Sequence, residues 1–142
     1  MPGVQGRMKL AASLLLAVLP VTAAACAETV ASTAPDSLSR LRDVMNDTIT
    51  NDTQDSEMWA LTQQVAAEKK LVGWTRSRVV AALGPGSECN PGIYACPGNL
   101  SSGDLIYWVG RLPEHVNGGT PALLIDLDED DRVIAISAIH TQ

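Results

Sequence analysis

The chain has 142 residues, a formal net charge of −6 and a sequence pI near 4.7. This length provides for one domain with a modest hydrophobic core once a targeting segment has been removed. The negative charge opposes binding to phosphate backbones and to anionic membrane surfaces, so no nucleic-acid partner is expected.

The first 27 residues have the pattern of a bacterial secretory signal peptide. Arg7 and Lys9 form a short basic head, and an apolar run with a single serine follows from Leu10 to Leu19. The run is shorter than the about 20 apolar residues that a membrane-spanning helix needs, and Pro20 interrupts it. The pattern therefore predicts export from the cytoplasm to the periplasm.

The small residues after this run are compatible with two processing routes. Ala25 and Ala27 form an A-x-A site, at which cleavage before Glu28 would discard Cys26 and give a soluble periplasmic or secreted protein. In the other route residues 23–26 form a lipobox, and Cys26 becomes the acylated residue that anchors the protein to the outer membrane. An unpaired thiol is unusual in an oxidising compartment. Cleavage before Glu28 removes the thiol of Cys26, and acylation modifies it. Lipidation at Cys26 is the route that we favour.

Residues 28–56 are rich in Ala, Ser, Thr, Asp and Asn, a composition that predicts a flexible N-terminal tether. Within it, apolar residues at helical spacing predict one short amphipathic helix over 37–45. The polar run 46–56 is interpreted as a solvated linker. The folded domain is therefore expected to cover residues 57–142.

Two helices are predicted at the start of this domain. The first is expected to begin at Glu57 and to stop at Gly73, and the second begins after Thr75, a typical N-cap residue, and stops at Gly84-Pro85. The buried face of the first helix is predicted to contain Met58, Leu61, Val65 and Val72.

A loop over residues 84–103 follows, because this segment contains too many glycines and prolines for a regular element. It holds Cys89 and Cys96, and in an exported protein two such cysteines predict a disulfide that restrains the loop. Metal ligation is the alternative, but no C-x-x-C motif is present and His115 and His140 are isolated in the sequence. No metal or other cofactor is expected.

The period of the apolar residues then changes from that of a helix to that of a strand. Strands are predicted over 104–109, 122–128 and 132–139, with an acidic turn at Asp130-Asp131 between the last two. The order of the elements predicts an α+β fold, in which two helices pack on a three-stranded antiparallel sheet as a two-layer ααβββ sandwich.

Four motifs in this region suggest a family. A helix starts at Gly73-Trp74-Thr75, a helix ends at Leu83-Gly84-Pro85, a strand carries Tyr107-Trp108, and an Asp-rich hairpin spans 125–133. Over residues 57–139 this pattern resembles the SmpA/OmlA outer-membrane lipoprotein family, also called BamE-like. The resemblance implies an ααβββ module, often lipid-anchored, that acts through contacts with other envelope components.

The chain departs from the family pattern at three places. Gly86 stands where the family usually has a second proline, Asp131 stands where it has the turn glycine, and the loop with Cys89 and Cys96 is longer. The general fold of the family is therefore implied more strongly than the role of its founding members, which belong to the machinery that inserts β-barrel proteins into the outer membrane.

No catalytic constellation is found in the sequence, and an enzyme is not expected. Asp126, Asp128 and Asp130 have the spacing of half a calcium loop, but the glycine and the bidentate glutamate that complete such a loop are replaced by Asp131 and Ser137. These aspartates are interpreted as an acidic hairpin turn. No small-molecule substrate is evident.

Two further features are weighed as binding sites. Arg76 and Arg78 lie at a helix N-terminus, where an anion could bind, although a solvated first turn is the simpler interpretation. Ile106 and Trp108 occupy the second face of strand 104–109, and two helices can cover only one face of the sheet. These two residues are the candidate partner surface, unless residues 36–45 cover them.

The leading hypothesis is a non-catalytic binding module of the cell envelope, whose partners are envelope proteins or the cell wall and which supports outer-membrane assembly or integrity. The alternative is a soluble periplasmic inhibitor or immunity-type protein that binds an enzyme, because a small α+β domain with a restrained loop suits that task.

Overall fold

The fold is described from a computed structural model, which describes residues 35–92, 96–114, 116 and 118–141. The predicted signal peptide, both processing routes and Cys26 lie outside the described residues, as does His115. None of the helices in the described part of the chain has the length and apolar character that a membrane span requires.

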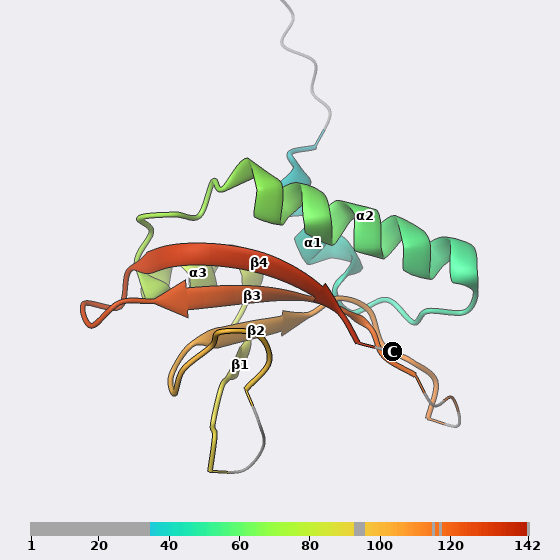
Figure 1. The fold of residues 1–142 in the computed structure, drawn as a ribbon. Helices are drawn as coiled ribbons and strands as arrows, with labels where there is room; N and C mark the ends of the chain where they lie inside the picture. The colour runs from blue at the N-terminus through green and yellow to red at the C-terminus, as the bar shows by residue number, and fades with distance from the viewer. Residues whose placement is uncertain (1–34, 93–95, 115, 117, 142) are drawn as a thin grey trace, which may run out of the picture. The chain divides into compact units, whose positions relative to one another are not determined.

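The described part of the chain folds into three helices and one four-stranded antiparallel sheet (Figure 1). The helices are α1 (Ser37–Val44), α2 (Asp52–Glu68) and α3 (Arg76–Leu83), and the strands are β1 (Ser87–Glu88), β2 (Leu105–Trp108), β3 (Pro121–Leu127) and β4 (Val133–His140). The strands lie in the order β1-β2-β3-β4. The α+β class is as predicted, and α1 coincides with the short helix predicted over 37–45. The sheet has one strand more than predicted, and three helices pack in the domain instead of two.

The predicted tether is wrong from residue 37 onward, because this part of the chain belongs to the folded domain. Leu38 and Leu41 of α1 are buried in the main core together with Ile49. α2 begins at Asp52 and not at Glu57, with the side chain of Asn51 accepting a hydrogen bond from the backbone N–H of Gln54 at 2.9 Å. The polar run interpreted as a linker is therefore largely a helix cap and a first helical turn.

The end of α2 also differs from the prediction. The helix ends at Glu68, because Lys69 takes the left-handed conformation with φ 52°. Val72 is consequently 44% exposed, whereas the preceding Leu71 is buried. The other three predicted face residues, Met58, Leu61 and Val65, are buried as expected.

The main core lies between the three helices and one face of the sheet. Alternate residues of the central strands point into it, and their partners across the strands share the same face, as Leu105 does with Ile125 and Tyr107 with Leu123. α3 fits this core as predicted: Thr75 caps its first turn by accepting from the backbone N–H of Arg78, and Gly84 ends it with φ 94°.

A second, smaller core lies on the opposite face of the sheet. It consists of buried Cys89, Ile106, Ala122 and Leu124, with Cys96, Leu100 and Ile139 packed against them. The structure contains the predicted disulfide between Cys89 and Cys96, with their Cα atoms 5.6 Å apart. The disulfide loop therefore forms a third layer over part of the sheet.

Removal of the disulfide is expected to weaken the protein without abolishing its fold. In the chain-entropy model, closure of so short a loop contributes about 2 to 3 kcal/mol. A variant with Cys89→Ser and Cys96→Ser should therefore lose about that much free energy of unfolding in a urea titration, while its far-UV circular dichroism stays close to that of the wild type. Wild-type protein reduced with dithiothreitol is the matched control. Equal stability of oxidised protein and variant would contradict the prediction.

A hydrogen-bonded cluster joins the start of α1 to the end of α2 and makes stability depend on pH. The hydroxyl of Ser37 donates to the carboxylate of Glu68, and the ammonium of Lys70 lies 3.0 Å from the same carboxylate. These donors, with Ser37 the strongest, lower the pKa of Glu68 to about 2. Because the folded-state pKa is lowered, the stabilisation is present above pH 4.5 and is lost as the pH falls toward 2.

The expected result is that acidification through this range lowers the unfolding midpoint of the wild type more than that of Glu68→Gln. Circular dichroism melts between pH 2 and 7 would measure both curves. Parallel pH profiles of the two proteins would show that the cluster does not contribute.

Candidate functional site

The two residues of the predicted partner surface have different environments. Both belong to β2, but Ile106 is only 1% exposed, because the disulfide loop packs over it, whereas Trp108 is 41% exposed. The prediction of an open surface is therefore wrong for Ile106. The alternative prediction, that residues 36–45 cover Ile106 and Trp108, is wrong as well, because Leu38 and Leu41 pack into the main core on the other face of the sheet.

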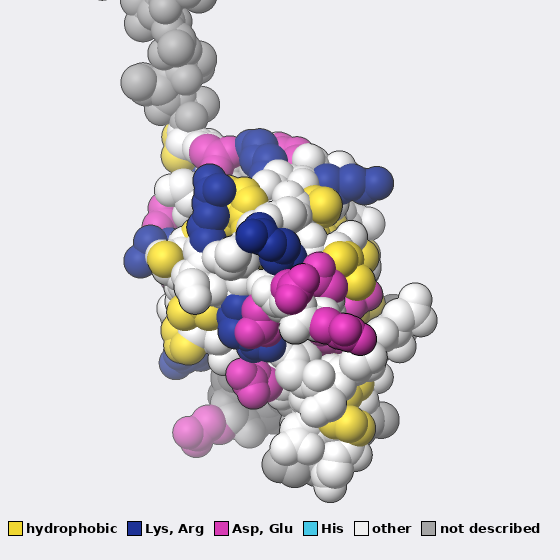
Figure 2. All heavy atoms as spheres, turned by 90° about the vertical axis from the view of Figure 1, so that its left-hand side faces the viewer, with side chains coloured by type: hydrophobic (Ala, Val, Ile, Leu, Met, Phe, Trp, Pro, Cys, Tyr) yellow, Lys and Arg dark blue, Asp and Glu magenta, His cyan; other side chains and the backbone are white. Residues whose placement is uncertain are grey.

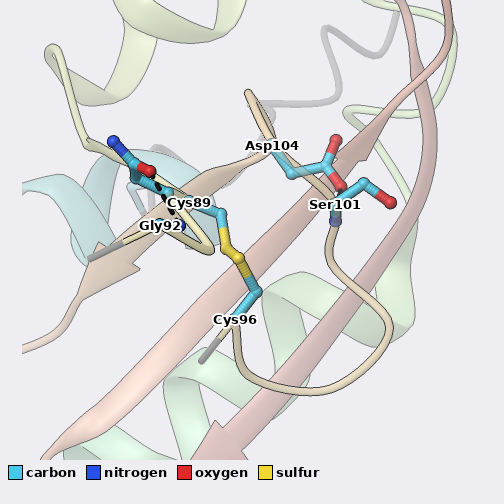
Figure 3. Close-up of a disulfide and its surroundings, with 6 residues drawn as sticks. Cys89, Gly92, Cys96, Ser101 and Asp104 are labelled. Carbon is cyan, nitrogen blue, oxygen red and sulfur yellow. Dashed lines mark hydrogen bonds between the residues drawn. A yellow bond between two sulfur atoms is a disulfide. The ribbon is translucent and has the colours of Figure 1, made fainter. Parts of the chain in front are cut away.

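A buried carboxylate fixes the disulfide loop to the sheet. Figure 3 shows the side chain of Asp104 beside Ser101, close to the disulfide. Asp104 is 2% exposed, and its two oxygens accept from the backbone N–H groups of Ser101 at 2.6 Å and of Leu127 at 2.9 Å. The backbone N–H of Cys89 also donates to the carbonyl of Asp104 at 2.7 Å. These bonds hold the loop in one place over Ile106, whereas Trp108, two residues further along the same face of β2, stays 41% exposed.

Trp108 lies at an open edge of the sheet. β1 pairs with β2 only at Leu105 and Ile106, so no strand of the described chain lies beside Trp108 on that side. Val109 donates its N–H to Pro121 at 2.8 Å, and backbone bonds alternate in direction along an antiparallel strand. The N–H and C=O of Trp108 therefore point away from β3, toward the open edge.

A groove of about 710 Å³ runs along this edge. The end of α1 and the segment after it form one wall, and the segment from the end of α3 to β1 forms the other. Residues of β2 form the floor. The lining residues are Arg42, Asp43, Met45, Asn46, Leu83, Gly84, Pro85, Gly86, Ser87, Ile106, Tyr107, Trp108, Gly110 and Arg111.

The wall formed by the end of α1 and the segment after it is joined to Gly110 and Arg111 by backbone hydrogen bonds. Gly110 donates to the carbonyl of Met45 at 3.0 Å, and Arg111 donates to that of Asp47 at 2.8 Å. Gly110 has φ 82°, and a Cβ there would lie 2.7 Å from the sulfur of Met58, so only glycine fits. The guanidinium of Arg111 donates to the side chain of Asn46 at 2.9 Å and is thereby oriented along the groove wall.

The opposite wall is held by Tyr107. Its hydroxyl donates to the carbonyl of Gly84 at 2.8 Å, and burial raises the pKa of Tyr107 to about 12, so the phenol remains a neutral donor at all physiological pH values. Gly86 lies directly over the ring: a Cβ there would approach the ring carbons to 2.8 Å. The groove is thus preformed, with Trp108 in its floor and Arg111 on one wall.

Arg76 and Arg78 do not form an open anion site. The guanidinium of Arg76 lies 2.9 Å from the carboxylate of Asp131 and 3.1 Å from that of Glu88, which neutralise its charge. The guanidinium of Arg78 stacks over the ring of Trp74 at 3.9 Å. Figure 2 views the end of the molecule at the left of Figure 1 and shows acidic and basic side chains next to one another there. These arginines are structural.

The described residues contain no cluster of metal-ligating side chains. Asp128 accepts from the backbone N–H groups of Asp130 and Arg132, both at 2.9 Å, so it serves the hairpin turn as the sequence suggests. His140 lies with Nε2 2.8 Å from the carboxylate of Asp55, against the ring of Trp59.

Burial raises the pKa of Asp126, and the neighbouring carboxylate of Asp104 raises it further. This carboxyl lines a small hollow beside Gly98 and Leu100 of the disulfide loop. Asn99 and Ser137 line the same hollow.

The strand pattern of the sequence identifies Trp108 but not the charged residues beside it. Arg42 comes from α1, interpreted as part of a tether, and Arg111 comes from the loop after β2. Their common location depends on the packing of α1 against α2 and α3, for which the sequence has no local signal. The apolar face of the helix over 37–45 was the one indication that this segment packs against something.

Comparison of the chain with protein-family models, with curated proteins and with solved structures found no match. The resemblance to the SmpA/OmlA family therefore remains a prediction.

The close contact between Gly86 and Tyr107 yields a stability prediction. Gly86 has φ 64°, so Gly86→Ala combines backbone strain of about 1 to 3 kcal/mol with a clash against the ring. Gly73→Ala is the matched control, because Gly73 has φ 83° but no atom within 4 Å of the place that a Cβ would take. Urea titrations should show a loss of stability that is larger for Gly86→Ala by about 1 kcal/mol or more. Equal losses of stability in the two variants would contradict the prediction and would mean that the groove wall at Gly86 shifts to accommodate the added methyl group.

Proposed function

We propose that this protein is a non-catalytic binding module of the bacterial cell envelope, which acts by contact with other envelope proteins through the groove at Trp108. The observation that carries the proposal is that the half-exposed Trp108 lines one preformed groove together with Arg42 and Arg111, at an unpaired strand edge. Tryptophan and arginine are the residues most often responsible for binding energy in protein interfaces.

The geometry favours a peptide segment of a partner over a small molecule. The groove lies at the edge of the sheet, where the outward N–H and C=O of Trp108 can pair with an extended backbone, as in β-strand addition. Asp43 lies on the same wall as Arg42, so the groove has charges of both signs and fits a mixed polar and aromatic segment better than a polyanion.

The location belongs to the proposal as well. The predicted signal peptide would deliver the protein to the periplasm, where the Cys89–Cys96 disulfide is stable, and acylation of Cys26 would anchor it to the outer membrane. A membrane-anchored module that binds partners fits a supporting role in outer-membrane assembly or integrity, in agreement with the resemblance to the SmpA/OmlA family.

The proposal is tested by photo-crosslinking in living cells. A photoreactive phenylalanine analogue at position 108 should give discrete adducts with envelope proteins, which mass spectrometry of the adducts would identify. The same probe at position 72, which is 44% exposed but far along the chain from the groove lining, is the matched control and should give none of these adducts. Identical adducts from both positions, or none from position 108, would overturn the proposal.

The substitution Trp108→Ala should weaken binding to the identified partner about 30-fold or more, the effect of losing an interface anchor worth about 2 kcal/mol. The free energy of unfolding should change by less than about 1 kcal/mol, because the indole is half exposed. Titration calorimetry and urea unfolding would measure the two quantities. A loss of 3 to 5 kcal/mol in stability, about the cost of truncating a core aromatic residue, would show that Trp108 belongs to the core.

The identity of the adduct also separates the proposal from the alternative. An assembly factor or another membrane-associated protein would support an envelope module. A single soluble hydrolase, bound one-to-one and inhibited, would favour the inhibitor or immunity-type protein instead.

A further inference from the structure

β4 forms the other edge of the sheet, and most of this edge is open. Within the described residues, strand-like pairing on its outer side is limited to its start, where Val133 exchanges hydrogen bonds with Gly73 and Trp74 at 2.8 and 2.9 Å. From residue 134 to His140, β4 pairs with β3 along its inner side, and no strand of the described chain pairs with its outer side.

The direction of the free backbone groups follows from the register. Thr141 donates its N–H to Thr120, so the residues of β4 in phase with Thr141 bond to β3, and the residues between them point outward. The N–H and C=O groups of Ile136, Ala138 and His140 therefore face the open edge.

This edge lacks the features that usually prevent a strand from pairing with another chain. The segment 133–139 contains no charged residue and no proline, and the one irregularity, opposite Asp126 and Leu127, lies near its start. Ile134, next to that irregularity, is 54% exposed. An apolar edge of this length calls for a partner strand.

We propose that the partner strand is β4 of a second copy, paired antiparallel about a twofold axis at Ser137, so that the two sheets join into one of eight strands. In this register Ile136 of each copy lies opposite Ala138 of the other, and Ala135 lies opposite Ile139. Ser137 meets its own symmetry mate.

The side-chain sizes select this register. On each face of the sheet, the pair of apolar residues next to the axis consists of one large and one small side chain. Such pairs fill the space between two neighbouring strands without gaps or overlap. Centring the axis on Ile136 would oppose two isoleucines, and centring it on Ala138 would oppose two alanines. The outward N–H and C=O groups of Ile136 also then meet those of Ala138.

The symmetry is compatible with the layers of the fold. Pairing that keeps each side chain on its own face places the helices of both copies on one side of the joined sheet and both disulfide loops on the other. β4 carries no like charges that would repel across the axis.

The register is tested by cysteine crosslinking. Each variant also carries Cys26→Ser, so that the introduced thiol is the only free one while the Cys89–Cys96 disulfide stays intact. Ser137→Cys should form a disulfide-linked dimer on mild oxidation, because the two thiols face each other at a non-hydrogen-bonded pair. Ala135→Cys, exposed on the same face, is the matched control and should remain monomeric, because its symmetry mate is about 14 Å away along the strand. Equal crosslinking of the two variants, or none at position 137, would overturn the proposal.

The association itself is tested by sedimentation of the protein recovered from the envelope, in detergent where it is acylated. The wild type should have the mass of a dimer. Ala138→Pro removes an N–H that β3 does not use, so the fold should persist by circular dichroism, while the loss of two intermolecular hydrogen bonds weakens the dimer about 30-fold. A wild type that remains monomeric at about 100 µM would overturn the proposal. The proposal does not depend on the Trp108 groove, because the two features lie on opposite edges of the sheet.

Discussion

The architecture depends on the need of an apolar sheet to be covered on both faces. β2 carries Leu105 and Tyr107 toward the helices and Ile106 toward the opposite side, and all three are buried. Three short helices cover only one face, so the second requires a cover of its own. The disulfide loop provides it, with Cys89 and Leu100 as its apolar contacts.

The loop can act as a layer because it is fixed at several points. The disulfide closes it, and the buried carboxylate of Asp104 links its backbone to β3. A segment so rich in glycine would otherwise lose too much conformational entropy on ordering to serve as a cover. The described part of the loop packs over Ile106 and leaves Trp108 41% exposed, so the cover that completes the fold also leaves Trp108 accessible in the groove.

The sequence predicted the elements that have a strong local pattern and missed those defined by tertiary contact. The strands over 104–109, 122–128 and 132–139 alternate clearly, and α3 has both a capping threonine and a terminating glycine. β1 is only two residues long and lies in a glycine-rich loop, so no periodicity could identify it. The start of α2 was missed because Asn51 and Asp52, which cap a helix here, are also common in linkers.

The candidate site could also be predicted only where the sequence has a local pattern. The alternation of β2 identified Ile106 and Trp108 as the face away from the helices, but which of them is exposed depends on where the disulfide loop ends. The sequence carries no measure of that distance. Arg42 and Arg111 reach the same groove only because α1 packs against α2 and α3 and the segment after α1 bonds to Gly110 and Arg111. These are contacts between segments far apart in the chain.

The two proposed surfaces complement each other through the order of the strands. The Trp108 groove lies at the β1-β2 edge and the self-pairing strand β4 lies at the other, so joining two copies along β4 leaves both grooves open at the ends of one continuous sheet. A pair of this kind presents two identical binding sites in a fixed relation. When two sites engage one partner assembly, the second binding event is intramolecular, and avidity exceeds the affinity of either groove. A groove with modest affinity is then sufficient for stable attachment, which suits a module that holds envelope components together by contact.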